Sequence, residues 1–79
     1  MPRIRVEYFA ILREHTGRGS EEIETGARTA AELFRELDGR YRFPRLASLK
    51  LAINDEFRDW DAGLADGDSV VFIPPVAGG

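Results

Sequence analysis

The segment best suited to chemistry is the run of eight residues that closes the chain, Phe72-Ile73-Pro74-Pro75-Val76-Ala77-Gly78-Gly79. Pro74 and Pro75 hold the backbone near the polyproline conformation, so the segment is expected to leave a preceding strand straight and outward. The four residues after Pro75 reach at most about 14 Å when extended. Gly78 and Gly79 carry no side chains and could thread a narrow channel. The expected reactive group is therefore the main-chain carboxylate of Gly79, carried into the active site of a partner protein.

The alternative is a frayed end without a role, because glycine-rich chain ends are commonly disordered. A Gly-Gly pair alone would favour that alternative. The stiff Pro-Pro pair directly after an apolar run favours a functional tail, since it lowers the entropy lost when a partner captures the segment.

Side-chain chemistry has little support elsewhere in the chain, which contains one histidine, no cysteine and three serines. His15 is best explained as a favourable charge near the end of a short helix. One histidine cannot make a zinc site, and the carboxylates lack the spacing of a calcium loop. Gly17-Arg18-Gly19 lacks the lysine and following Ser/Thr of a phosphate loop. No metal, no stably bound cofactor and no independent catalysis are expected.

The composition predicts one globular domain: 79 residues, 43% of them apolar, with a net charge of −3. The ten arginines and the single lysine, Lys50, are scattered along the chain, so nucleic acid is not an expected partner. No apolar run approaches the length of a signal sequence or a membrane span. A cytoplasmic protein without a membrane partner is expected.

Hydrophobic periodicity predicts the elements of the first half of the chain. Apolar residues alternate over 3–9 as in a half-buried strand, and a short helix over 10–16 stops at Gly17. The charged residues of 21–24 suit an exposed edge strand. Thr29 and Glu32 form a capping box, in which each side chain satisfies a free amide at the start of the main helix, and Gly39 marks its expected end.

The second half predicts two more strands. Residues 49–53 alternate as a strand, and Asn54-Asp55 turns the chain toward Phe57, which is expected within a turn. After a second turn over 64–68, the β-branched and aromatic run 69–73 suits a central strand. The order strand, strand, helix, strand, strand predicts an α+β fold, a mixed sheet packed on one main helix. We expect a folded domain over 1–75 and a flexible tail over 76–79.

Alternation also places apolar residues on the outer face of the sheet. If Val70 and Phe72 point inward, Val71 and Ile73 point outward, and Phe9 lies beside them at the end of the first strand. Together with Phe57 these residues predict a partner-binding patch. Burying Phe9, Phe57 and Ile73 would contribute roughly 5–9 kcal/mol, which is comparable with association costs of about 4–15 kcal/mol, so binding through the patch alone would be reversible.

Three features near this patch have simpler structural explanations. Phe9 could simply end the core, and the acidic residues between Asp55 and Asp68 are more typical of solvated turns than of an electrostatic docking surface. Trp60, between two aspartates, is expected to hold its turn against the sheet.

Several motifs together resemble those of the sulfur-carrier subunits of molybdopterin synthase (MoaD type), relatives of ubiquitin in the MoaD/ThiS β-grasp family. They are Tyr8-Phe9-Ala10-Ile11-Leu12-Arg13-Glu14, Thr29-Ala30-Ala31-Glu32-Leu33, Ala52-Ile53-Asn54, Leu64-Ala65-Asp66-Gly67-Asp68 and the segment from Phe72 to Gly79. The resemblance spans nearly the whole chain. Carriers for thiazole synthesis (ThiS type) share the Gly-Gly ending but usually lack Pro-Pro before it, so the molybdenum-cofactor branch is favoured.

The resemblance implies a ubiquitin-like β-grasp fold and a mechanism. An activating enzyme related to ubiquitin-activating enzymes uses ATP to adenylate Gly79, and a sulfurtransferase's persulfide then converts the carboxylate to a thiocarboxylate. The tail donates this sulfur to precursor Z inside the large synthase subunit, in a heterotetramer with one carrier at each end. Phe9, Phe57 and Ile73 correspond to apolar contacts of the carrier, with the Phe57 match resting on a variable turn.

Other readings of the same tail stay open. The carrier could supply sulfur to another pathway, such as thiazole or thiamine synthesis or thiolation. The activated glycine could instead be joined to lysines, as in a ubiquitin-like protein modifier. A β-grasp interaction module with an idle tail is the third alternative.

Overall fold

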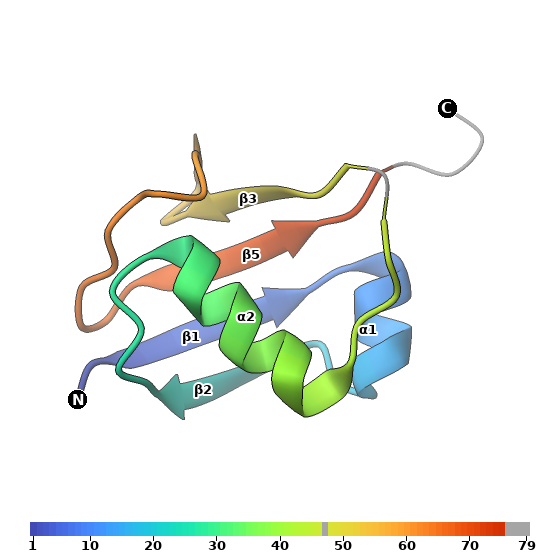
Figure 1. Ribbon diagram of the computed structural model, residues 1–79, viewed down its shortest axis with the longest axis horizontal. Helices are drawn as coiled ribbons and strands as arrows, with labels where there is room; N and C mark the ends of the chain where they lie inside the picture. Colours follow the sequence, from blue (N-terminus) through green and yellow to red (C-terminus); the bar gives the residue numbers. More distant parts are fainter. Residues whose placement is uncertain (47, 76–79) are drawn as a thin grey trace.

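One long helix lies across one face of a five-stranded mixed sheet in the computed structural model, which describes residues 1–46 and 48–75 (Figure 1). In chain order the elements are β1 (Arg3–Tyr8), α1 (Ala10–Thr16), β2 (Ser20–Glu24), α2 (Ala30–Tyr41), β3 (Lys50–Ile53), β4 (Glu56–Arg58) and β5 (Ser69–Ile73). The strand order is β2-β1-β5-β3-β4, in which β1 and β5 are parallel and the other pairs antiparallel. The predicted α+β architecture, with a short helix after the first strand, is confirmed.

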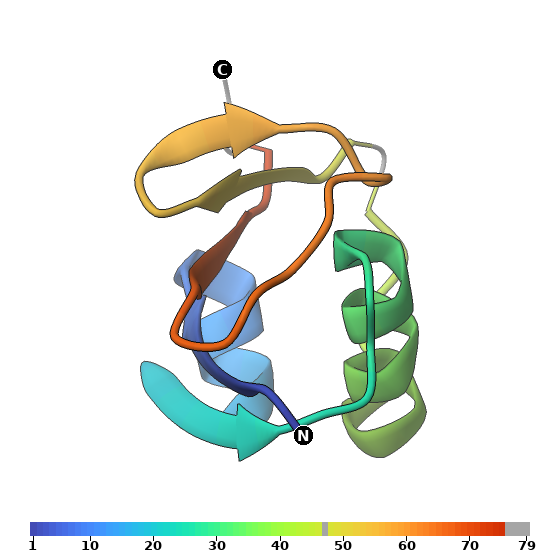
Figure 2. The same cartoon turned by 90° about the vertical axis from the view of Figure 1, so that its left-hand side faces the viewer.

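The core lies between the sheet and α2, which Figure 2 shows as two layers. Alternation along β1 and β5 supplies it, because Ile4, Val6, Val70 and Phe72 are fully buried while the residues between them are not. The helix adds Leu33 and Leu37 from its inward side. These strands are the central ones of the sheet, as the β-branched run at 69–73 predicts.

The start of α2 confirms the predicted cap in part. The Thr29 side chain accepts a hydrogen bond from the Glu32 amide at 3.2 Å, but the Glu32 carboxylate accepts from the amide of Arg28, one residue before the cap. The first helical amides, of Ala30 and Ala31, donate to carbonyls of Ala62 and Trp60. The segment between β4 and β5 therefore holds the start of the helix.

The predicted end of the main helix at Gly39 is wrong. The helix continues to Tyr41 and ends where Arg42 takes a left-handed conformation with φ of 53°. A glycine inside a helix costs about 1 kcal/mol relative to alanine. Asp38 offsets this cost, because its carbonyl accepts from the Arg42 amide and its carboxylate from the Phe43 amide.

Two predictions about strands also need correction. The first strand ends at Tyr8, because Phe9 is the residue that precedes α1. Phe57 does not lie in a turn. It is the middle residue of β4, a strand that the sequence analysis did not predict and that pairs with β3 after the Asn54-Asp55 turn. The three residues of β4 are too few to give an alternation of apolar and polar residues that would predict a strand.

Candidate functional site

The outer face of the sheet, opposite α2, brings the predicted apolar residues together. Val71 on β5 is flanked by Glu7 on β1 and by Ala52 on β3, and Phe57 on β4 lies opposite Ala52. One row across the sheet therefore carries Val71, Ala52 and Phe57. Ile73 lies two residues along β5, on the same face.

Phe9 joins this row at the end of β1. The parallel register ends with Tyr8 opposite Phe72, so Phe9 follows beside Ile73. The chain turns sharply there, because Ala10 has φ of 50° and the amides of Leu12 and Arg13 donate to the Phe9 carbonyl. The burial of Leu12 then anchors α1 to the core.

These residues form one surface, which we call the outer patch: Phe9, Ala52, Phe57, Val71 and Ile73. Phe57 is 72% exposed and Phe9 is 49% exposed, whereas the three others are half-buried. Phe9 therefore does not complete the core. The four residues named from the sequence lie on one face of the sheet, two of them exposed and two half-buried, and their role in partner binding stays a prediction. A contiguous apolar surface of this kind is typical of a protein interaction site.

Ala52 is the member that the sequence prediction omitted. Its outward direction follows from the burial of Leu51 and Ile53 on either side of it. Its position between Val71 and Phe57 could not be predicted from the sequence, because it depends on the pairing of β3 with both β5 and β4.

The patch lies beside the point where the chain leaves the sheet. β5 ends at Ile73, Pro74 is buried and Pro75 is exposed. Pro74 therefore packs against the folded domain and Pro75 faces solvent, and the threading role predicted for both residues stays a prediction. Val76, Ala77, Gly78 and Gly79, with their predicted roles, lie outside the described residues.

A polar cluster on the inner face fixes the end of β1 next to the patch. The Glu21 carboxylate accepts hydrogen bonds of 2.6 Å from the hydroxyls of Tyr8 and Tyr41. Its other oxygen lies 3.2 Å from the Arg18 guanidinium and 4.0 Å from that of Arg40. The cluster joins β1, β2 and α2.

Ionisation within this cluster follows from its contacts. Burial opposes the charge on Glu21, but the hydrogen bonds from Tyr41 and Tyr8 and the charges of Arg18 and Arg40 outweigh it and lower the pKa of Glu21. Burial and the hydrogen bond to Glu21 raise the pKa of Tyr8, and the same causes raise the pKa of Tyr41. At neutral pH the cluster therefore holds an ionised carboxylate and two neutral phenols.

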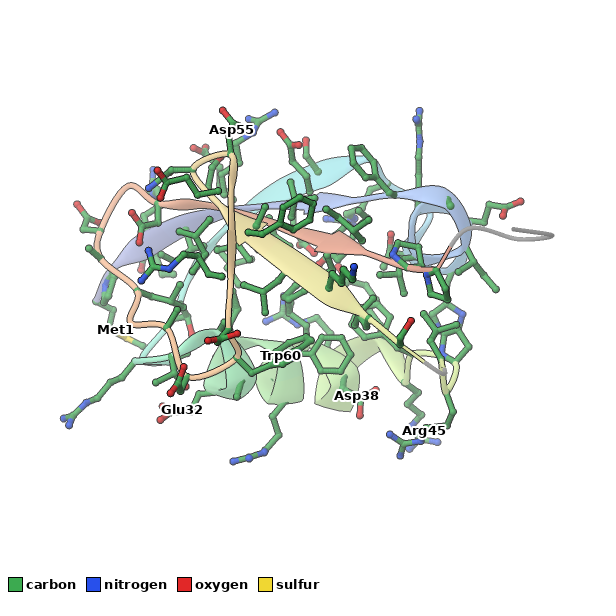
Figure 3. All side chains as sticks on the ribbon, turned by 90° about the horizontal axis from the view of Figure 1, so that it is seen from above. Met1, Glu32, Asp38, Arg45, Asp55 and Trp60 are labelled. Carbon is green, nitrogen blue, oxygen red and sulfur yellow. The ribbon has the colours of Figure 1, made fainter. Side chains whose placement is uncertain are left out.

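The remaining polar predictions have structural explanations. His15 stands at the end of α1, but its Nε2 lies 2.7 Å from the carbonyl of Tyr41, at the end of α2, so that nitrogen carries the proton in this contact. Asp66 accepts from the Arg3 amide, and Asp68 accepts from the Asn54 side chain and the Ala65 amide. Trp60 lies between the sheet and α2 (Figure 3), stacked on Phe72 with ring centroids 6.0 Å apart. Its predicted role in holding the turn is confirmed.

Within residues 1–46 and 48–75, no group of three or more His, Cys, Asp or Glu side chains is placed to hold a metal ion. Neither α1 nor α2 combines the length and the apolar character that crossing a membrane requires.

Comparison with known proteins gives consistent matches over almost the whole chain. The sequence model of the ThiS family matches residues 6–79. The chain is 35% identical over 86 residues to the molybdopterin synthase sulfur carrier subunit of Mycobacterium tuberculosis, and the alignment covers 100% of both chains.

Solved structures support the same relationship. Molybdopterin converting factor subunit 1 from Pyrococcus furiosus superposes with a TM-score of 0.79 at 33% identity, over 96% of this chain and 100% of that one. A chain of the complex of subunits 1 and 2 of the molybdopterin-converting factor from Helicobacter pylori has a TM-score of 0.70 at 26% identity, covering 98% of this chain and 99% of that one. These matches confirm the ubiquitin-like β-grasp fold that the resemblance implied.

Proposed function

Because this chain belongs to the ThiS family, we propose that it is the sulfur carrier subunit of a molybdopterin synthase. The observation that carries the proposal is the placement of the outer patch beside the end of β5, from which the chain continues into Pro75 and the Gly-Gly segment. A partner that covers the patch would receive that segment. The relatives with the same extent, named as sulfur carrier subunits, support this role.

The proposed chemistry takes place on the carboxylate of Gly79. An ATP-dependent activating enzyme joins this carboxylate to AMP, with loss of pyrophosphate, and so makes the acyl carbon reactive. The outer sulfur of a sulfurtransferase persulfide then attacks the acyl carbon and displaces AMP, which gives an acyl disulfide. A thiol cleaves the S–S bond of this acyl disulfide, becoming oxidised to a disulfide itself, and leaves a thiocarboxylate on Gly79. A carrier that holds sulfur on its main chain needs no thiol of its own, which agrees with the cysteine-free composition.

The carrier itself is not the catalyst in this proposal. It docks through the outer patch on the large synthase subunit, and residues 76–79 enter the active site of that subunit, where the sulfur passes to precursor Z. Two carriers bind at opposite ends of a dimer of large subunits. Pro75 favours an outward path for the tail, and the buried Pro74 ties the start of that path to the domain. ATP is used by the activating enzyme, and no cofactor is held stably by the carrier.

Intact mass spectrometry tests the proposal directly. The untagged protein is incubated with the activating enzyme, ATP and a sulfurtransferase, and fragmentation locates any change. The expected result is one oxygen replaced by sulfur at Gly79. A protein truncated after Ala77 serves as the matched control, because it keeps the whole described domain, and it should neither gain sulfur nor support molybdopterin formation.

Two outcomes would overturn the proposal. One is unchanged Gly79 in the presence of an activating enzyme that modifies its own known carrier. The other is Gly79 joined by isopeptide bonds to lysines of many unrelated proteins, which would identify a protein modifier.

A further inference from the structure

Lys50 lies on the same face as the outer patch. It is the first residue of β3 and is paired across the sheet with Ile73, which alternates along β5 with the buried Val70 and Phe72 of the inner face. Paired residues of adjacent strands point to the same side. The Lys50 side chain is therefore exposed on the outer face, next to the end of β5.

The charged side chains on this face differ in their ionic contacts. On the β1 side, the Glu7 carboxylate lies 3.5 Å from the guanidinium of Arg5. On the β3 side, the Lys50 ammonium group makes no hydrogen bond or ion pair with any residue in 1–46 or 48–75. Lys50 also lines a shallow groove with Phe57, Leu49, Leu51, Arg58 and Asp59. Within the part of the chain that the structure describes, this ammonium group therefore has no ionic contact and lies at the border of an apolar surface.

Covering the outer patch would remove water from this ammonium group. An unpaired charge that loses its hydration opposes binding, whereas a charge that meets an opposite charge is compensated and also selects its partner. Among the basic side chains, this one is also the only lysine, a compact point charge with three donors.

We propose that Lys50 forms an ion pair with an Asp or Glu side chain of the protein that covers the outer patch, and that this pair sets the docked orientation in which residues 76–79 enter the partner. The inference rests on the proposed function, and its occupant is the large synthase subunit. Lys50 is a positioning residue in this scheme and takes no part in sulfur transfer. The outer patch supplies the contact area, and the ion pair fixes the orientation of the docked carrier.

The single lysine makes a site-specific test possible. A carbodiimide activates a carboxyl group, the Lys50 amine attacks it, and an amide forms while the carbodiimide takes up the elements of water as a urea. Because the reagent leaves no spacer, only groups already in contact are joined. Applied to the complex of the carrier with the large subunit, the reaction should give a cross-linked peptide pair that contains Lys50 and an Asp or Glu of the large subunit.

Three variants separate charge from reactivity. Lys50→Met keeps most of the stem, and should lose the cross-link and bind the large subunit about tenfold or more weakly at low salt, with less dependence on salt than the wild type. Lys50→Arg should restore binding without restoring the cross-link. Arg35→Met makes the same charge change on the exposed side of α2, and should bind as the wild type does.

The outcomes distinguish this inference from the proposed function. If the wild-type carrier does not bind the large subunit, both fail. If it binds, and Lys50→Met binds equally well at both salt concentrations, only the Lys50 inference is overturned. A complex that forms without any cross-link at Lys50 also contradicts it, whatever sulfur transfer at Gly79 shows.

Discussion

The two faces of the sheet depart from the rule of apolar inside and polar outside in opposite directions. The inner face contains a carboxylate, Glu21, whose side chain is only 9% exposed. The outer face contains a phenylalanine, Phe57, that is 72% exposed. Residue type alone would have placed each of them on the other side.

The difference lies in what each side chain contacts. Glu21 has two hydroxyl donors and two nearby guanidinium groups, so its burial is compensated. Phe57 belongs to a continuous apolar row that ends at an edge strand and that α2 does not cover. Within the described residues α2 covers the inner face, whereas Phe9 and Phe57 of the outer face are exposed.

Removal of an inner-face side chain should have the largest effect on stability. Phe72 is fully buried and contacts the rings of Phe34 and Trp60. Phe72→Ala is expected to destabilise the domain by about 3–5 kcal/mol, because it leaves a cavity between the sheet and α2. Urea unfolding followed by circular dichroism measures this loss, and a change below about 1 kcal/mol would contradict the described core.

The polar cluster should give a smaller effect that depends on pH. Glu21→Gln removes a charged acceptor of two hydrogen bonds, and should cost about 1.5–3 kcal/mol at pH 7. Since the pKa of Glu21 is lowered by folding, its ionised form stabilises the native state at pH values above its unfolded pKa of about 4.3. That contribution is lost as the pH falls through the lower, folded pKa.

Unfolding of the wild type and of Glu21→Gln should therefore be compared between pH 7 and pH 3. The gap in unfolding free energy between them should be constant down to about pH 4.3 and should narrow below it. Glu22→Gln is the matched control on the exposed side of the same strand. A gap that stayed constant to pH 3 would mean that the cluster does not hold an ionised Glu21.

The outer face should show the smallest effect on stability and a clear effect on binding. Phe57→Ala is expected to change the unfolding free energy by about 0.5 kcal/mol or less, as for other exposed positions. Binding to the large synthase subunit should weaken by about tenfold or more, because an exposed aromatic of this kind acts as an anchor. Calorimetric titration of the folded variant measures this. Unchanged affinity would remove Phe57 from the docking surface.

Local sequence patterns predicted much of the fold and of the candidate site. Alternation in β1 and β5 identified the residues of each face, and Thr29 marked the start of α2. These signals depend only on neighbours in the chain, so they can be read before any pairing is known. β4 was missed because Glu56–Arg58 forms a strand only through its contacts with β3.

The sequence by itself determined which residues of β1 and β5 point outward and that a stiff segment followed by glycines comes directly after the last strand. Only the tertiary structure decided that Ala52 connects Val71 with Phe57, that Glu21 meets both tyrosines, and that Lys50 stands beside Ile73. The physical reason is that the side-chain direction within a strand follows from its own backbone. Which strands become neighbours is set instead by contacts between residues far apart in the chain, and these contacts leave no periodic pattern in the local sequence.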